Sequence, residues 1–197
     1  IVSMFPLHTQ ANTSASTNVT CSDGLCDDQI MSLHKLARFG SFEAMTLLSM
    51  VYATGDGREA DPVKALRYLE RAARHRYPTA VFLLSEWYRQ GLVVPQDLQQ
   101  ANILLTEAVK LQHPPALYKR ALQLLQLPDD ASLAKGITLL RQASDKRLVN
   151  AMFMLARLKQ QGIYTATDME GAARLFESLV LSGHDESRVF LRETIAM

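Results

Sequence analysis

The most constraining feature of this 197-residue sequence is a motif that recurs about every 36 residues. Four alanines mark its copies, at intervals of 36, 36 and 35 residues: Ala44, Ala80, Ala116 and Ala151. A leucine follows four positions later in three copies, and a tyrosine eight positions later in two: Leu48, Leu84 and Leu155, then Tyr52 and Tyr88. Self-similarity at a fixed period of this length is the signature of a repeat protein.

Each copy of the motif is predicted to form two helices. Ala80, Leu84 and Tyr88 are four residues apart, so they share one face of a first helix. The second helix is expected to begin at an aspartate, because a carboxylate there accepts N–H groups of the first turn. The candidate capping residues are Asp61, Asp97 and Asp168. In the loop between the helices, Gly55 is expected to supply a positive φ.

One helix pair cannot bury its own apolar face, whereas a stack of neighbouring pairs can. The sequence therefore predicts an all-α fold, a right-handed α-solenoid of about four stacked helix pairs. The expected repeats span 44–79, 80–115, 116–150 and 151–187, with capping helices over 29–43 and 188–197. The third repeat is degenerate, since it has Arg120 in the leucine column and Leu124 in the tyrosine column.

The motif resembles the Sel1-like repeat, a relative of the tetratricopeptide repeat. Ser49 and Ser85 depart from it, because the family prefers glycine there. The first copy carries the resemblance in the pattern Ala44…Leu48…Tyr52-x-x-Gly55-x-Gly57…Asp61-x-x-Lys64-Ala65…Ala72-Ala73. The resemblance implies a non-catalytic adaptor that binds a peptide or protein through its concave face, in an assembly such as those of the bacterial envelope.

Composition and motifs narrow the function further. Lys and Arg minus Asp and Glu gives 21 − 20 = +1, so no overall field favours nucleic acid or an anionic membrane. No apolar run approaches the roughly 18–20 residues that span a bilayer. H-E-x-x-H, G-x-S-x-G and phosphate-loop motifs are absent, so we expect no metal and no cofactor.

An enzyme is the alternative from another class of protein. Some exported, cysteine-rich proteins similar to this family are β-lactamases or penicillin-binding proteins, with a disulfide in every repeat. This chain has no cysteine in its repeats and lacks S-x-x-K and K-T-G. We therefore favour a protein without catalytic residues.

The helix face opposite the buried stripe is the candidate binding surface. Aromatic residues stand two positions after the leading alanine in three repeats, and residues of varying charge follow four positions later. At 100° per residue these columns point about 200–240° away from the alanine. The candidate partner-binding residues are Met50, Phe82, Glu86, Tyr118, Lys119, Phe153 and Arg157. Alternatively, the aromatic residues pack between adjacent first helices.

Residues 1–28 differ from the rest, since Thr9–Thr20 is rich in Ser, Thr and Asn and carries no charge. We expect an extended arm there, which offers a route to homo-oligomers if it lies on a neighbouring copy. Cys21 and Cys26 are predicted to form a disulfide, and together with the apolar start of the chain they favour a periplasmic or secreted protein. Two free thiols in the cytoplasm are the alternative.

Overall fold

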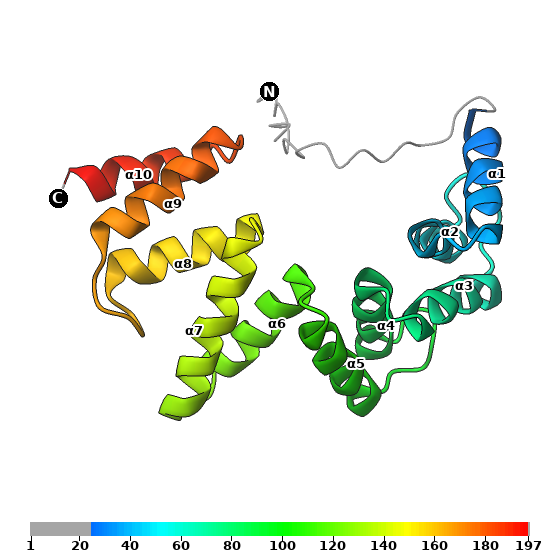
Figure 1. Cartoon of the computed structure of the whole chain (residues 1–197), viewed down its shortest axis with the longest axis horizontal. Coiled ribbons are helices and arrows are strands. Elements are labelled where there is room, and N and C mark those ends of the chain that lie inside the picture. Colours follow the sequence, from blue (N-terminus) through cyan, green and yellow to red (C-terminus); the bar gives the residue numbers. More distant parts are fainter. Residues whose placement is uncertain (1–24, 197) are drawn as a thin grey trace, which may run out of the picture.

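The computed structural model is an arc of helices (Figure 1). The structure describes residues 25–196, and every regular element in that range is an α-helix. The helices are α1 (Leu25–Arg38), α2 (Phe42–Thr54), α3 (Pro62–Arg74), α4 (Pro78–Gln90), α5 (Leu98–Lys110), α6 (Pro114–Leu125), α7 (Asp130–Asp145), α8 (Val149–Gln161), α9 (Met169–Leu181) and α10 (Ser187–Ile195). The predicted all-α solenoid is confirmed.

The helices form four pairs, α2 with α3, α4 with α5, α6 with α7 and α8 with α9, flanked by α1 and α10. In Figure 1 the first helices α2, α4, α6 and α8 lie towards the inner side of the arc, and α3, α5 and α7 lie towards its outer side. We call the surface carried by α2, α4, α6 and α8 the inner face. It is the face to which the candidate binding residues belong.

The helix ends follow the predicted capping chemistry. Asp61, Asp97 and Asp168 each accept hydrogen bonds from backbone N–H groups in the first turns of α3, α5 and α9, at 2.8–2.9 Å. Gly55 ends α2 with a φ of 77°, the left-handed conformation that glycine adopts without steric cost. These short-range signals fix where each helix pair turns.

Several helices start or stop at residues other than those expected. Pro78 and Pro114 are the first residues of α4 and α6, two positions before the marking alanines, because proline fits a first turn whose N–H groups have no helical partner. The N-terminal helix, expected over 29–43, is α1, which ends at Arg38 before Gly40 with its φ of 92°. The C-terminal helix, expected over 188–197, is α10.

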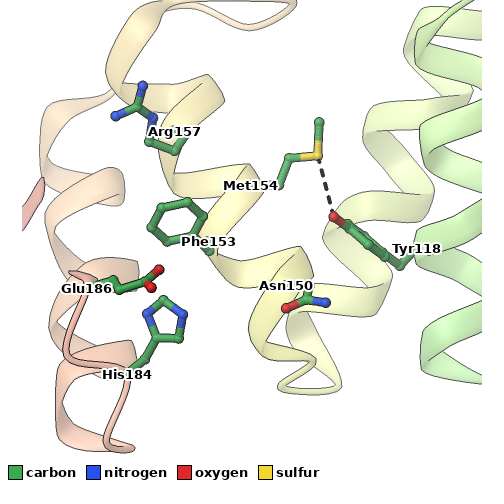
Figure 2. Close-up of a pocket in the computed structure, with 7 residues that line it drawn as sticks. All are labelled: Tyr118, Asn150, Phe153, Met154, Arg157, His184 and Glu186. Carbon is green, nitrogen blue, oxygen red and sulfur yellow. Dashed lines mark hydrogen bonds between the residues drawn. The ribbon is translucent and has the colours of Figure 1, made fainter. Parts of the chain in front are cut away.

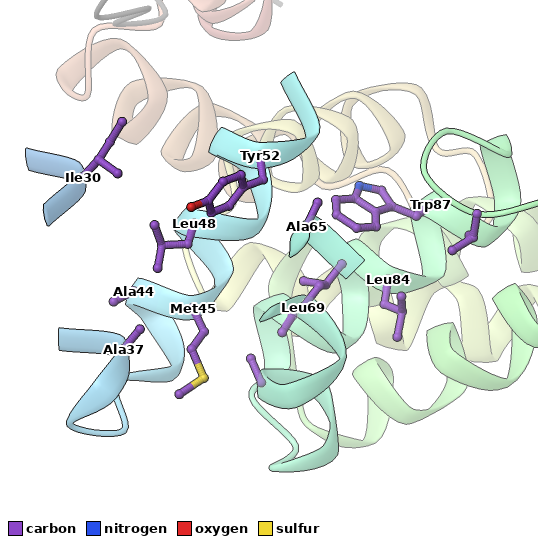
Figure 3. Packing of buried hydrophobic residues seen from close by; sticks show 13 residues of the cluster. Ile30, Ala37, Ala44, Met45, Leu48, Tyr52, Ala65, Leu69, Leu84 and Trp87 are labelled. Atoms are coloured by element: carbon purple, nitrogen blue, oxygen red, sulfur yellow. The ribbon is translucent and has the colours of Figure 1, made fainter. Parts of the chain in front are cut away.

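Small residues occupy the crossings between helices. Ala80, Ala116 and Ala151 are fully buried, so neighbouring backbones approach closely at these points. Gly136 of α7 also lies at a close crossing, because an added Cβ would lie 3.1 Å from the Leu125 side chain. Around the crossings, large side chains fill the core, and Figure 3 shows the part near α2, α3 and α4 with Leu48, Leu69, Leu84 and Trp87.

We predict that Asp97→Ala lowers the free energy of unfolding by about 1 kcal/mol, because two N–H groups of α5 lose their acceptor. The measurement is urea unfolding followed by far-UV circular dichroism. Asp56→Ala is the matched control, since Asp56 is an exposed loop residue that caps no helix, and it should change stability by only a few tenths of a kcal/mol. Equal losses in both variants would contradict the assignment of Asp97 as a cap.

Candidate functional site

The predicted aromatic column lies on the inner face and is half-buried. Phe82 of α4 packs against His113, with ring centroids 4.9 Å apart, and Phe153 of α8 packs against His184 at 5.5 Å. These histidines occupy equivalent positions, where one repeat passes into the next. The column therefore contributes to packing where one repeat meets the next, while part of each ring stays accessible.

Two members of the column help to line a cavity between α6, α8 and the loop that precedes α10. We call it the inner-face cavity. Its volume is about 380 Å³, close to the lower end of the range for ligand sites. It is lined by Tyr118, Asn150, Phe153, Met154, Arg157, His184 and Glu186, as Figure 2 shows. Three of the seven predicted binding residues, Tyr118, Phe153 and Arg157, thus meet in one site.

Tyr118, Phe153 and Met154 form the apolar part of the inner-face cavity, and polar side chains complete its walls. Among the described residues the Tyr118 hydroxyl donates to the Met154 Sδ alone, at 4.0 Å, and a thioether is a weak acceptor. Burial raises the pKa of Tyr118, so its hydroxyl stays protonated and available to a better acceptor. Met154 has three rotatable bonds and can move to fit an incoming group. One arriving side chain would thus meet two aromatic rings, a flexible thioether and one hydroxyl.

Glu86 and Lys119, predicted to contact a partner, are paired with each other. Lys119 Nζ lies 2.5 Å from a Glu86 carboxylate oxygen and Arg89 Nη2 lies 2.7 Å from the other. Burial raises the pKa of Glu86, but its hydrogen bonds and charge interactions with Arg89 and Lys119 outweigh burial and leave that pKa below its ordinary value. This ion-pair cluster ties α4 to α6, so most of its charge is used within the protein.

Arg157 is placed differently from Glu86. Its guanidinium lies over the Phe190 ring of α10, with the Cζ atom 4.4 Å from the ring centroid. Among residues 25–196 it has no ion-pair partner within 4.0 Å. The cation is therefore held by an aromatic face at the edge of the inner-face cavity, and its charge is not neutralised by a described carboxylate.

Other predicted site residues lie apart from the cavity. Met50 of α2 is 39% exposed but does not line it, and neither does Phe82. Cys21 lies outside the described residues and so does the side chain of Cys26, so the disulfide stays a prediction. The same holds for self-association through residues 1–28, which are described only from residue 25 onward.

Sequence reasoning missed Asn150, Met154 and Glu186 as site residues. Asn150 and Met154 flank Phe153 on α8, so helical periodicity could have identified them as candidate site residues. Glu186 comes from the loop before α10, and no repeat signal linked that loop to α6. His184, which also lines the cavity, was not among the predicted binding residues either.

Two further properties describe the surroundings of the site. Within the described range, no three His, Cys, Asp or Glu side chains gather in a way that could hold a metal ion. None of the helices in that range combines the length and the apolar character that a membrane crossing requires.

Comparison with known proteins assigns the class of this solenoid. The family described as Sel1 repeat matches residues 42–77, 78–113 and 149–184, which together are more than half of the chain. The chain therefore belongs to the Sel1 repeat family. The degenerate third repeat is not matched, yet it folds as the helix pair α6 and α7.

Two relatives illustrate the breadth of the similarity. Protein SHC1 of Saccharomyces cerevisiae is 28% identical over 179 residues, which cover 86% of this chain and 35% of SHC1. The chain thus spans about a third of the length of this curated relative. A Sel1 repeat protein from Oxalobacter formigenes is 24% identical with a TM-score of 0.73, over 84% of this chain and 49% of that one. This structural likeness supports the fold.

His113 gives a prediction for pH. Burial lowers its pKa from 6.5 to about 4, and its Nδ1 is buried without a hydrogen-bond partner. The unfolded chain therefore binds this proton more readily than the folded one, so the contribution of His113 is complete above pH 6.5 and is lost as the pH falls towards 4. Allowing for its partial exposure, we expect a loss of about 1 kcal/mol between pH 7 and pH 5.

The check is urea unfolding at pH 7 and pH 5 for the parent and for His113→Leu, since Leu148 occupies the equivalent helix start before α8. The variant should lose less stability on acidification than the parent. Thr138→Leu, at an exposed residue of α7 that does not titrate, is the control for an added leucine and should follow the parent. If His113→Leu had the same pH dependence as the parent, the assignment of a buried neutral imidazole would be wrong.

Proposed function

We propose that this chain is a non-catalytic scaffold that holds a segment of a partner protein against its inner face, at the inner-face cavity. Sel1 repeat solenoids are commonly protein–protein interaction scaffolds and are typically non-catalytic. The observation that carries the proposal is the convergence of Tyr118, Phe153 and Arg157, from two repeats, on one cavity.

The physical argument is preorganisation. Helices α6 and α8 hold the cavity walls in place before a partner arrives, so little conformational entropy is lost on binding. Tyrosine and arginine are the residue types most often found at the energetic centres of protein interfaces, together with tryptophan. A protein partner is favoured over a small molecule because the cavity opens onto the inner face of a curved array, which a longer segment can follow.

The location of the protein and its lack of catalytic activity are separate predictions from the sequence. The periplasmic or secreted location rests on residues 1–28 alone and stays a prediction, as does its cytoplasmic alternative. The absence of catalytic activity is supported by the family and by the missing motifs.

Site-specific photocrosslinking tests the proposed function. A photoreactive amino acid placed at Asn150, an exposed residue of the cavity, should crosslink to a discrete protein in cells that express the full chain. The same group at Thr138, an exposed residue of the outer helix α7, is the matched control and should not capture that protein.

The crosslink from position 150 should be lost on Tyr118→Ala and on Phe153→Ala, because each removes a wall of the inner-face cavity. Circular dichroism verifies that each variant folds, and the identified partner, once purified, should bind the parent more tightly than the folded variants. Capture that is equal from positions 150 and 138, or that survives both substitutions, would refute binding at the inner-face cavity.

A further inference from the structure

The inner face carries a net positive charge in one column of residues, which the repeat pattern alone does not reveal. Four residues form the second candidate column: Met50, Glu86, Leu122 and Arg157. Two of them are neutral, and Glu86 is neutralised by Lys119 and Arg89. Arg157 is the remaining charge in the column, and it has no described carboxylate within 4.0 Å. The net electrostatic character of this column at the cavity is therefore positive.

Arg157 is also preorganised for a carboxylate. Its guanidinium lies over the Phe190 ring, which restricts the side chain, and Arg157 is half-buried rather than enclosed. The guanidinium N–H groups match the two oxygens of a carboxylate in a bidentate pair. A lysine at this position would lack the planar fork of N–H donors, so the residue type matters.

Glu186 sets the direction in which such a partner lies. Figure 2 shows Glu186 beside His184, with Phe153 between that pair and Arg157. A second carboxylate on the Glu186 side would be repelled, whereas one on the Arg157 side would be attracted. His184 Nδ1 is hydrogen-bonded to Ser187 Oγ at 2.8 Å, so this ring is held in place at that end of the cavity.

We infer that the partner is an acidic peptide segment: one large apolar side chain enters the inner-face cavity beside Phe153, and a neighbouring Asp or Glu pairs with Arg157. This inference rests on the proposed function and gives it a chemical class of partner. The apolar side chain buries area against Tyr118, Phe153 and Met154, and pairing of the carboxylate with Arg157 orients the bound segment.

Selection from a random peptide library displayed on phage, with the full chain as the target, tests the inference. Peptides whose binding is lost on Tyr118→Ala are those that use the inner-face cavity. Among them we expect an Asp or Glu at a fixed spacing from an aromatic or large aliphatic residue. Fluorescence anisotropy with the corresponding synthetic peptides then gives their affinities.

Arg157→Gln should lower the affinity for these peptides by about tenfold or more, which is the effect of losing a charge-assisted hydrogen-bond pair. Arg157→Lys should restore part of the affinity. Arg141→Gln, on the outer helix α7, is the matched control and should leave binding unchanged. Replacing the peptide's acid by its amide should weaken binding to the parent but not to Arg157→Gln, because the pair is already broken there.

Failure of the acidic-segment inference and failure of the proposed function give different results. Peptides that need Tyr118 but carry no acid, or that bind Arg157→Gln as well as the parent, would overturn the acidic-segment inference and leave the proposed function in place. If no enriched peptide depends on Tyr118 or Phe153, the proposed binding at the cavity fails as well.

Discussion

Burial of the apolar face of each helix pair against the next pair is the interaction on which the rest of the structure depends. A pair of about thirteen-residue helices has too little core of its own, so stability comes from the faces shared between pairs. The fully buried alanines at the crossings set the close approach of the helices. The inner-face cavity then follows as a consequence, because stacking brings side chains of α6, α8 and the loop before α10 around one hollow.

Much of this fold could be predicted from the sequence because repetition makes the same local signals recur. The caps at Asp61, Asp97 and Asp168 were predicted and are confirmed. The expected repeats 44–79 and 80–115 include Pro78 and Pro114 at their ends, whereas both prolines are the first residues of the next helices, α4 and α6. Proline suits both positions, and only the backbone distinguishes them.

The third helix pair shows which part of a repeat motif the fold needs. Arg120 and Leu124 depart from the motif, yet both are only half-buried. The contacts that hold α6 to α7 come from positions that keep the repeat register: the fully buried Leu140 corresponds to Leu69 and Leu105, and the closely packed Gly136 corresponds to Ala65 and Ala101. A degenerate sequence therefore still forms a pair when its buried positions keep the right size.

The candidate site was predicted less completely than the fold. Helical periodicity identified the face that carries Tyr118 and Phe153, because that depends on the angle between residues of one helix. It could not show that Glu86 pairs with Lys119, 33 residues away, or that Arg157 lies over Phe190. Those contacts depend on how successive repeats are rotated and on side-chain rotamers.

The most direct test of the shared core follows urea unfolding of Leu140→Ala by two probes, the fluorescence of Trp87 in the second repeat and far-UV circular dichroism. If the pairs form one stack, both probes should move together to lower urea by the equivalent of about 2–5 kcal/mol. A Trp87 transition that stays at the parent's midpoint while the dichroism signal shifts would show that the pairs fold independently.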